Sequence, residues 1–142
     1  MLLDLCTLAF FYCLGISWLL QAAIYPTYHL VGPADFVPFH VAQGKRMIPV
    51  MVVPMFATSV LGIATAVLLR GEPYALLLWG VGLCGVIVIA TTLLSELPKH
   101  MKLDTLGKDD RLIDGLIKDN LPRSLAWTVG AVLLVLAQRQ AG

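Results

Sequence analysis

Charged residues are scarce in this chain and are absent from the middle of its long apolar runs. Asp, Glu, Lys and Arg make up 13% of the 142 residues, whereas hydrophobic residues make up 58%. A soluble domain carries about 25% charged residues. The deficit indicates a single integral-membrane domain, residues 1–142, and the lack of a central ionisable group argues against a proton-coupled transporter or pump.

Net charge and paired cysteines are lacking as well. A formal net charge of +1 offers no basic surface, so nucleic acid is not expected as a partner. Cys6, Cys13 and Cys84 lie in apolar segments and form no C-x-x-C pair. This pattern predicts buried cysteines that behave as small hydrophobes rather than thiol–disulfide chemistry.

Long apolar runs are what the chain has instead. A helix needs about 20 apolar residues to cross a bilayer. The four runs that reach or approach this length cover about residues 5–25, 47–69, 74–97 and 125–137. The short "RGEP" stretch (70–73) predicts an antiparallel hairpin between the second and third runs. We therefore expect an all-α fold, a four-transmembrane-helix bundle.

The segment between the third and fourth runs has its own helical pattern. Its sequence, "KDDRLIDGLIKDNLP" (108–122), carries apolar residues with helical spacing at Leu112, Ile113, Leu116 and Ile117. Asp109 and Asp110 suit a helix start, and Pro122 marks the expected end. The pattern predicts a short amphipathic helix lying at the membrane interface.

The segment after the first run also reads as helical. Gly32 and Pro33 begin it, and it is expected to continue directly into the second run, with kinks where prolines interrupt it. The prolines concerned are Pro38, Pro49 and Pro54.

The basic residues are distributed unevenly between the two sides of the membrane. Loops one (26–46) and three (98–124) carry eight of the ten Lys and Arg residues. The positive-inside rule therefore places both loops in the cytoplasm, in what we expect to be a bacterial inner membrane.

Polar residues gather at the end of the bundle where these two loops lie. In "SELPKHMKLD" (95–104), Glu96, His100 and Asp104 are each four residues apart, which puts them on one face of a helix. The other polar residues expected at this end are Tyr25, Tyr28, His29, Asp35, His40, Lys45, Arg46, Asn120 and Arg123.

Imidazole and carboxylate groups together are ligands for iron, zinc or manganese, and such a site can activate oxygen or water. His40 and His100 would supply the nitrogen ligands, and Glu96 or Asp104 would supply oxygen. The same set also suits a metal-free polar binding site.

Two other interpretations are open for these residues. Glu96 can pair with Lys99 or Arg46, in which case the cluster is a set of ion pairs at the membrane interface and not a binding site. A haem clamped by His40 and His100 is disfavoured, because both histidines lie near loops.

Two stretches resemble a known family. "YPTYHLVGPADFVPFHVAQGKRM" (25–47) and "LPKHMKLDTLGKDDRLIDGLIKDNLPRSLAWT" (97–128) resemble paired motifs of small bacterial four-helix membrane proteins, loosely akin to anthrone-oxygenase-like proteins. The family positions carried over are His40, Arg46, His100, Asn120 and Arg123. The chain departs from the family pattern at Leu121, where the family has Trp, and at Val129, where it has Arg. The resemblance implies oxidation of a polycyclic aromatic substrate.

These residues support two functional hypotheses. In the first, the protein is a membrane oxidoreductase or oxygenase-like enzyme for a lipophilic aromatic or quinone-like molecule. His40, His100 and Glu96 would then be metal ligands or acid–base groups, and Arg46 and Arg123 would hold an anionic or enolate oxygen. Substrate contacts would also come from Tyr25 and Asn120. In the second, the protein is a non-catalytic accessory or assembly subunit of a larger membrane complex, or it forms a homo-oligomer.

Overall fold

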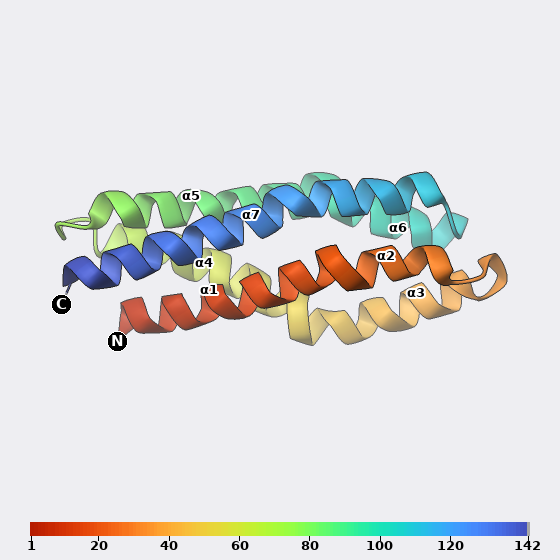
Figure 1. Cartoon of the computed structure of the whole chain (residues 1–142), viewed down its shortest axis with the longest axis horizontal. Helices are drawn as coiled ribbons and strands as arrows, with labels where there is room; N and C mark the ends of the chain where they lie inside the picture. The colour runs from red at the N-terminus through yellow and green to blue at the C-terminus, as the bar shows by residue number, and fades with distance from the viewer. Residues whose placement is uncertain (142) are drawn as a thin grey trace.

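Four long helical rods packed side by side make up the molecule (Figure 1). The computed structural model describes residues 1–141, and these residues contain no strand. The rods cover Leu2–Leu30, Pro33–Leu68, Ala75–Leu106 and Asp110–Ala141, and each is long and apolar enough to cross a membrane. The expected all-α bundle of four helices is confirmed.

Short irregular turns divide three of the four rods into shorter helices. The α-helices are α1 (Leu2–Leu19), α2 (Tyr25–Thr27), α3 (Pro33–Met47), α4 (Val53–Leu68), α5 (Ala75–Thr91), α6 (Leu97–Leu106) and α7 (Asp110–Ala141). Wider π-helical turns occur at Leu20–Ile24, Ile48–Val52 and Thr92–Glu96, and a 3₁₀ turn occurs at Tyr28–Leu30.

Prolines account for the positions of the π-helical turns. A proline within a helix lacks the N–H that would bond to the carbonyl four residues earlier, and its ring clashes with that carbonyl. For Pro26, Pro54 and Pro98, the residue four positions earlier lies inside one of the three π-helical turns. The wider turn relieves the clash, so each rod continues past its proline instead of ending there.

Two helix ends that were expected at prolines are wrong, because the helix continues past the proline in both places. The first rod does not stop at Pro26 but continues to Leu30, and the amphipathic segment does not end at Pro122. Instead α7 runs without a break from Asp110 to Ala141, so the amphipathic segment and the fourth span are one helix. Pro122 is exposed, whereas its neighbours Asn120 and Arg123 are buried and bonded to other helices, which holds the helix together on both sides of the proline.

The connections between rods lie at opposite ends of the bundle. Both chain ends lie at the same end as the α4–α5 turn, and the links from α2 to α3 and from α6 to α7 lie at the other end (Figure 1). The α4–α5 turn is tight, with the amide of Glu72 donating to the carbonyl of Leu69 over 3.1 Å. The expected hairpin and the shared end of loops one and three are therefore confirmed.

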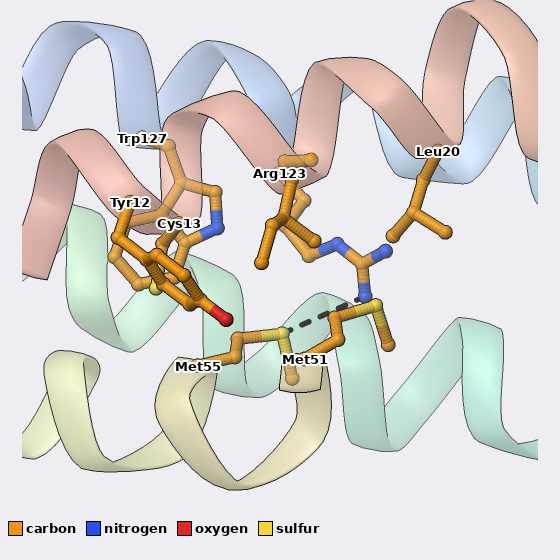
Figure 2. Close-up of a pocket in the computed structure, with 9 residues that line it drawn as sticks. Tyr12, Cys13, Leu20, Met51, Met55, Arg123 and Trp127 are labelled. Carbon is orange, nitrogen blue, oxygen red and sulfur yellow. Dashed lines mark hydrogen bonds between the residues drawn. The ribbon is translucent and has the colours of Figure 1, made fainter. Parts of the chain in front are cut away.

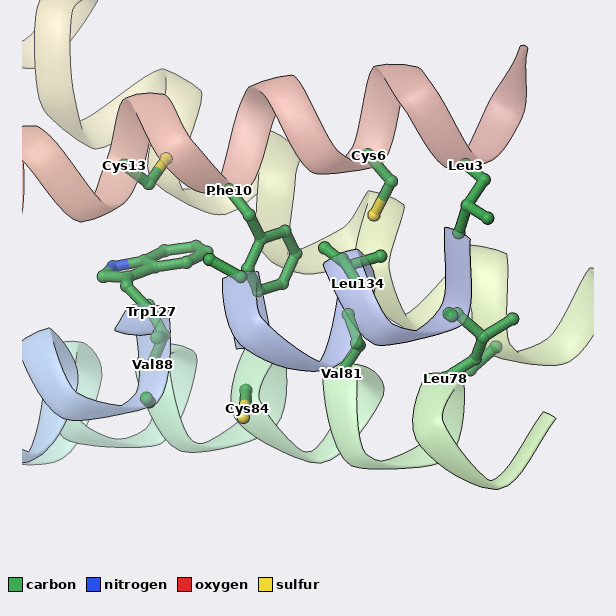
Figure 3. Packing of buried hydrophobic residues seen from close by; sticks show 14 of the residues in the cluster. Leu3, Cys6, Phe10, Cys13, Leu78, Val81, Cys84, Val88, Trp127 and Leu134 are labelled. Carbon is green, nitrogen blue, oxygen red and sulfur yellow. The ribbon is translucent and has the colours of Figure 1, made fainter. Parts of the chain in front are cut away.

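An apolar core fills the half of the bundle that holds the chain ends (Figure 3). Phe10 of α1 and Trp127 of α7 meet edge to face, with ring centroids 4.9 Å apart. Gly62 makes room for Phe10, since a Cβ added there would lie 3.0 Å from the ring. Small residues let the helices approach closely, which is how helices associate in lipid.

A second, smaller apolar cluster lies in the opposite half. Its buried members are Leu20, Tyr25, Tyr28, Phe36, Leu103, Ile113 and Leu116. The apolar face predicted for the amphipathic segment is thus turned toward the bundle, with Ile113 and Leu116 fully buried. This cluster surrounds a group of buried polar side chains.

Candidate functional site

Two histidines from different rods meet inside the half of the bundle formed by α3 and α6. Nε2 of His40 (α3) and Nδ1 of His100 (α6) lie 3.0 Å apart, within hydrogen-bond distance. Their rings are stacked, with centroids 5.1 Å apart and planes inclined by 20°. The expected proximity of His40 and His100 is confirmed.

Asp104 holds the outer nitrogen of His40. Its Oδ1 lies 2.6 Å from Nδ1 of His40, the ring nitrogen that faces away from His100. The His40 side chain is only 3% exposed, whereas that of Asp104 is 41% exposed. Asp104 therefore connects the buried histidine pair to the surface of the molecule.

Tyr25 extends this chain of contacts inward. Its hydroxyl lies 3.4 Å from Nε2 of His100 and 3.2 Å from Oε2 of Glu96. The same hydroxyl accepts a hydrogen bond from Nη2 of Arg123 over 3.4 Å. Tyr25 is 1% exposed, so one buried hydroxyl joins the histidine pair to a second, charged pair.

Glu96 and Arg123 form that charged pair. Nη1 of Arg123 lies 2.7 Å from Oε2 of Glu96, and both side chains are 2% exposed. Glu96 thus pairs with Arg123 and not with Lys99 or Arg46. The π-helical turn that ends at Glu96 directs its side chain into the bundle, while Lys99 faces α7 and pairs with Asp119.

Asn120 secures the arginine from one turn away on the same helix. Its Oδ1 accepts from Nε of Arg123 over 3.0 Å, and its Nδ2 donates to Oε1 of Gln21 over 2.7 Å. Beside it, the hydroxyls of Ser17 and Ser124 lie 2.7 Å apart and join α1 to α7. These contacts hold Arg123 on α7 and join α7 to the first rod.

A groove of about 340 Å³ borders the histidine pair. Its polar end is formed by Tyr25, His40, His100 and Asp104, and apolar side chains such as Leu20, Met51 and Leu97 line the rest. A smaller pocket of about 10 Å³, called the inner pocket below, lies between Met51, Met55, Trp127 and Arg123 (Figure 2). Leu20 and Met51 line both spaces and so separate the groove from the inner pocket.

The structure leaves three of the expected polar residues outside this site. Asp35 is exposed near the start of α3 and does not line the groove. Arg46 is exposed at the end of α3, and the lining of the groove includes Lys45 but not Arg46. His29 lies beyond the cluster, with its ring nitrogens 3.0 Å and 3.1 Å from carboxylate oxygens of Asp110 and Asp114.

The positions of the histidine and carboxylate side chains show whether they converge on one point, as metal ligands would. Among residues 1–141, no group of three or more His, Cys, Asp and Glu side chains is placed to hold a metal ion. Glu96 contacts Arg123 and Tyr25, and Asp104 lies at the ring nitrogen of His40 that faces away from His100. The assignment of His40, His100 and Glu96 as metal ligands stays a prediction, and the observed contacts are those of acid–base groups.

Some residues of the cluster had no clear signal in the sequence. Asp104 did have a signal: it lies four residues after His100, which predicted that both side chains share one face of the helix, and both contact His40. In contrast, Thr92 and Met55 accept contacts from Nη1 of Arg123 over 3.4 Å and 3.7 Å. Nothing in an isolated Thr or Met within an apolar run indicates such a contact.

Searches against protein-family models, curated proteins and solved structures give no match to this chain. What the structure supports of the expected family is its architecture, a small helical protein with four candidate membrane spans.

Proposed function

We propose that the protein is a membrane-embedded enzyme that removes a proton from a lipophilic aromatic or quinol-like molecule held in the groove. Proton removal is the first step of the oxidoreductase- or oxygenase-like chemistry expected from the sequence. The observation that carries the proposal is the line of contacts from Asp104 through His40 and His100 to Tyr25, at the polar end of a mainly apolar groove.

Hydrogen-bond directions along this line identify the basic atom. A carboxylate only accepts, so Nδ1 of His40 donates to Asp104, and a neutral imidazole then has only an acceptor left at Nε2. His100 must therefore donate to His40 from Nδ1. The Tyr25 hydroxyl, which lies 3.4 Å from Nε2 of His100, donates its single proton to Oε2 of Glu96. Nε2 of His100 is therefore left as a free acceptor, and it is the general base that we assign.

The same line gives the proton a way out of the bundle. When Nε2 of His100 takes a proton from a ring hydroxyl, the proton on Nδ1 of His100 can pass to His40, and the one on His40 can pass to Asp104. Asp104 is exposed enough to release it to water. The deprotonated ring is more readily oxidised, and an acceptor such as dioxygen would take its electrons.

The second hypothesis, an accessory subunit, is distinguished by the form of the polar end. An assembly surface would spread its polar side chains over an accessible face. Here Tyr25, His40, Glu96 and Arg123 are each no more than 3% exposed and converge beside a groove. This enclosure supports an active or binding site over a docking surface.

Removal of either histidine tests the proposal. We expect His40→Ala and His100→Ala each to lower oxidation of decylhydroquinone or anthrone by about 10²–10⁴-fold, because both belong to one proton path. The double variant should be no worse than either single variant. Oxygen consumption and ring absorbance of protein in lipid nanodiscs would measure this, with elemental analysis to detect any bound metal.

His29→Ala is the matched control, because His29 lies outside the groove. It should leave turnover unchanged. If wild-type protein turned over none of these compounds and the His40 and His100 variants bound them as the wild type does, the accessory-subunit hypothesis would replace the enzyme.

A further inference from the structure

The buried carboxylate of Glu96 is only half satisfied. Its Oε2 pairs with the guanidinium of Arg123 and accepts a hydrogen bond from the Tyr25 hydroxyl. Its Oε1 has no hydrogen-bond partner within residues 1–141. Glu96 is 2% exposed, so bulk water does not reach it. A buried acceptor without a donor is unfavourable, and the site is completed only when something donates a hydrogen bond to this atom.

The charges beside Glu96 restrict what that donor can be. Arg123 already neutralises Glu96, and its remaining N–H groups face Asn120, Tyr25 and Thr92. Lys45 also lines the groove, but it makes no contact with Glu96. An anionic group placed against Oε1 would therefore find no free cation there, and the carboxylate would repel it. A cationic ligand would lie close to the guanidinium of Arg123, which would repel it in turn. A neutral donor meets neither penalty.

Glu96 itself lines neither space, but it lies behind the wall between them, in contact with a residue of each. Its partner Tyr25 lines the groove, and its partner Arg123 lines the inner pocket. Leu20 and Met51 are shared by both spaces. A ring that moved past these two side chains would bring a substituent between the groove and the inner pocket, toward the Glu96–Arg123 pair.

We propose that Glu96 is a specificity-determining residue whose Oε1 accepts a hydrogen bond from a neutral hydroxyl on a lipophilic ring. The site thereby selects hydroxyl-bearing rings over their ethers and over anions. The inference rests on the proposed function for the identity of the groove as the substrate site. It adds the substrate class: a neutral phenol or quinol rather than a phenolate or a carboxylate.

Binding of three matched probes tests this without any turnover. Decylhydroquinone, its dimethyl ether and decylbenzoquinone would be titrated anaerobically into protein in lipid nanodiscs, with calorimetry as the readout. We expect wild-type protein to bind the hydroquinone at least about tenfold more tightly than the ether, since a hydrogen bond to a charged acceptor is a strong one. This comparison needs no variant and so does not depend on the folding of one.

Glu96→Gln sharpens the result. The amide replaces one acceptor with an N–H donor, so the preference for the hydroquinone should fall and decylbenzoquinone, whose carbonyls accept, should gain affinity. Asp119→Asn is the matched control, because this carboxylate pairs with Lys99 away from the groove. It should keep the wild-type order of affinities.

The outcomes separate this inference from the proposed function. If wild-type protein bound hydroquinone and ether equally well, Glu96 would not accept a hydrogen bond from the ring hydroxyl. The inference would then be overturned, even with turnover intact. If Glu96→Gln kept the wild-type preference for the hydroquinone, another acceptor such as Nε2 of His100 would account for it, and the inference would be overturned. If Glu96→Gln lost the preference while wild-type protein oxidised none of the compounds, the inference would stand and the proposed enzyme would fail.

Discussion

The two halves of the bundle are held together by different means. In the half with the chain ends, glycines of one helix lie directly against side chains or backbone of another, as Gly62 does at Phe10 and Gly85 at Ser59. In the half with α3 and α6, a line of polar contacts runs from Asp104 to Arg123 beside an open groove. The first half is close-packed, and the second is hydrogen-bonded around a space.

The boundary between the halves coincides with the π-helical turns. The three turns at Leu20–Ile24, Ile48–Val52 and Thr92–Glu96 lie between the residues of the large apolar core and most residues of the smaller cluster. A π-helical turn inserts one extra residue and so rotates the helix beyond it. The comparison teaches that a rigid packed half can support a second half whose helices are locally widened to enclose a site.

The largest effect is expected from breaking the buried pair in the polar half. Glu96→Ala leaves the Arg123 guanidinium buried and uncompensated, which should lower the free energy of unfolding by about 3–5 kcal/mol. Replacing both partners, with Glu96→Ala and Arg123→Met, should recover most of this loss. Reversible denaturation in mixed micelles would measure both variants. A single variant as stable as the double one would show that the pair is solvated and not part of the scaffold.

A smaller effect is expected from crowding the packed half. A Cβ at Gly85 would lie 2.8 Å from the carbonyl oxygen of Ser59, which is backbone and cannot rotate away. Gly85→Ala should therefore destabilise the protein by about 1–3 kcal/mol. Gly15→Ala is the control, because a Cβ there meets nothing within 4 Å. Equal stability of the two variants would contradict the close packing inferred for α4 and α5.

The architecture was predictable because it rests on local patterns. Apolar runs of sufficient length, the "RGEP" turn and the helical spacing of Ile113 and Leu116 each describe a few consecutive turns. The approach of His40 to His100 was expected from two loops on one side of a bundle. Helix ends were less predictable, since Pro26 and Pro122 are ordinary stop signals that packing overrides here.

The partners inside the site were not predictable in the same way. Lys99 and Arg46 were the partners expected for Glu96, and the choice of Arg123 depends on the rotation that the turn Thr92–Glu96 imposes. Arg46 resembled a site residue by its place in a motif, yet it is exposed at the end of α3. Side-chain direction past an irregular turn depends on the tertiary fold and is absent from sequence spacing.

The smallest effect is expected from a polar contact outside both halves. His29 bridges the α2–α3 link to the start of α7 through Asp110 and Asp114, whose side chains are 68% and 71% exposed. Exposed ion pairs contribute only about 0.2–1 kcal/mol, so His29→Ala should change the free energy of unfolding by no more than this. Protease cleavage near residues 107–110 should still rise, because the start of α7 loses its two contacts with the His29 ring. The rise should be modest, since Lys108 keeps its bond to the carbonyl of Val31. Limited proteolysis beside the unfolding measurement would separate the two effects. A loss as large as that of Glu96→Ala would mean that the exposed bridge, and not the buried pair, holds the polar half together.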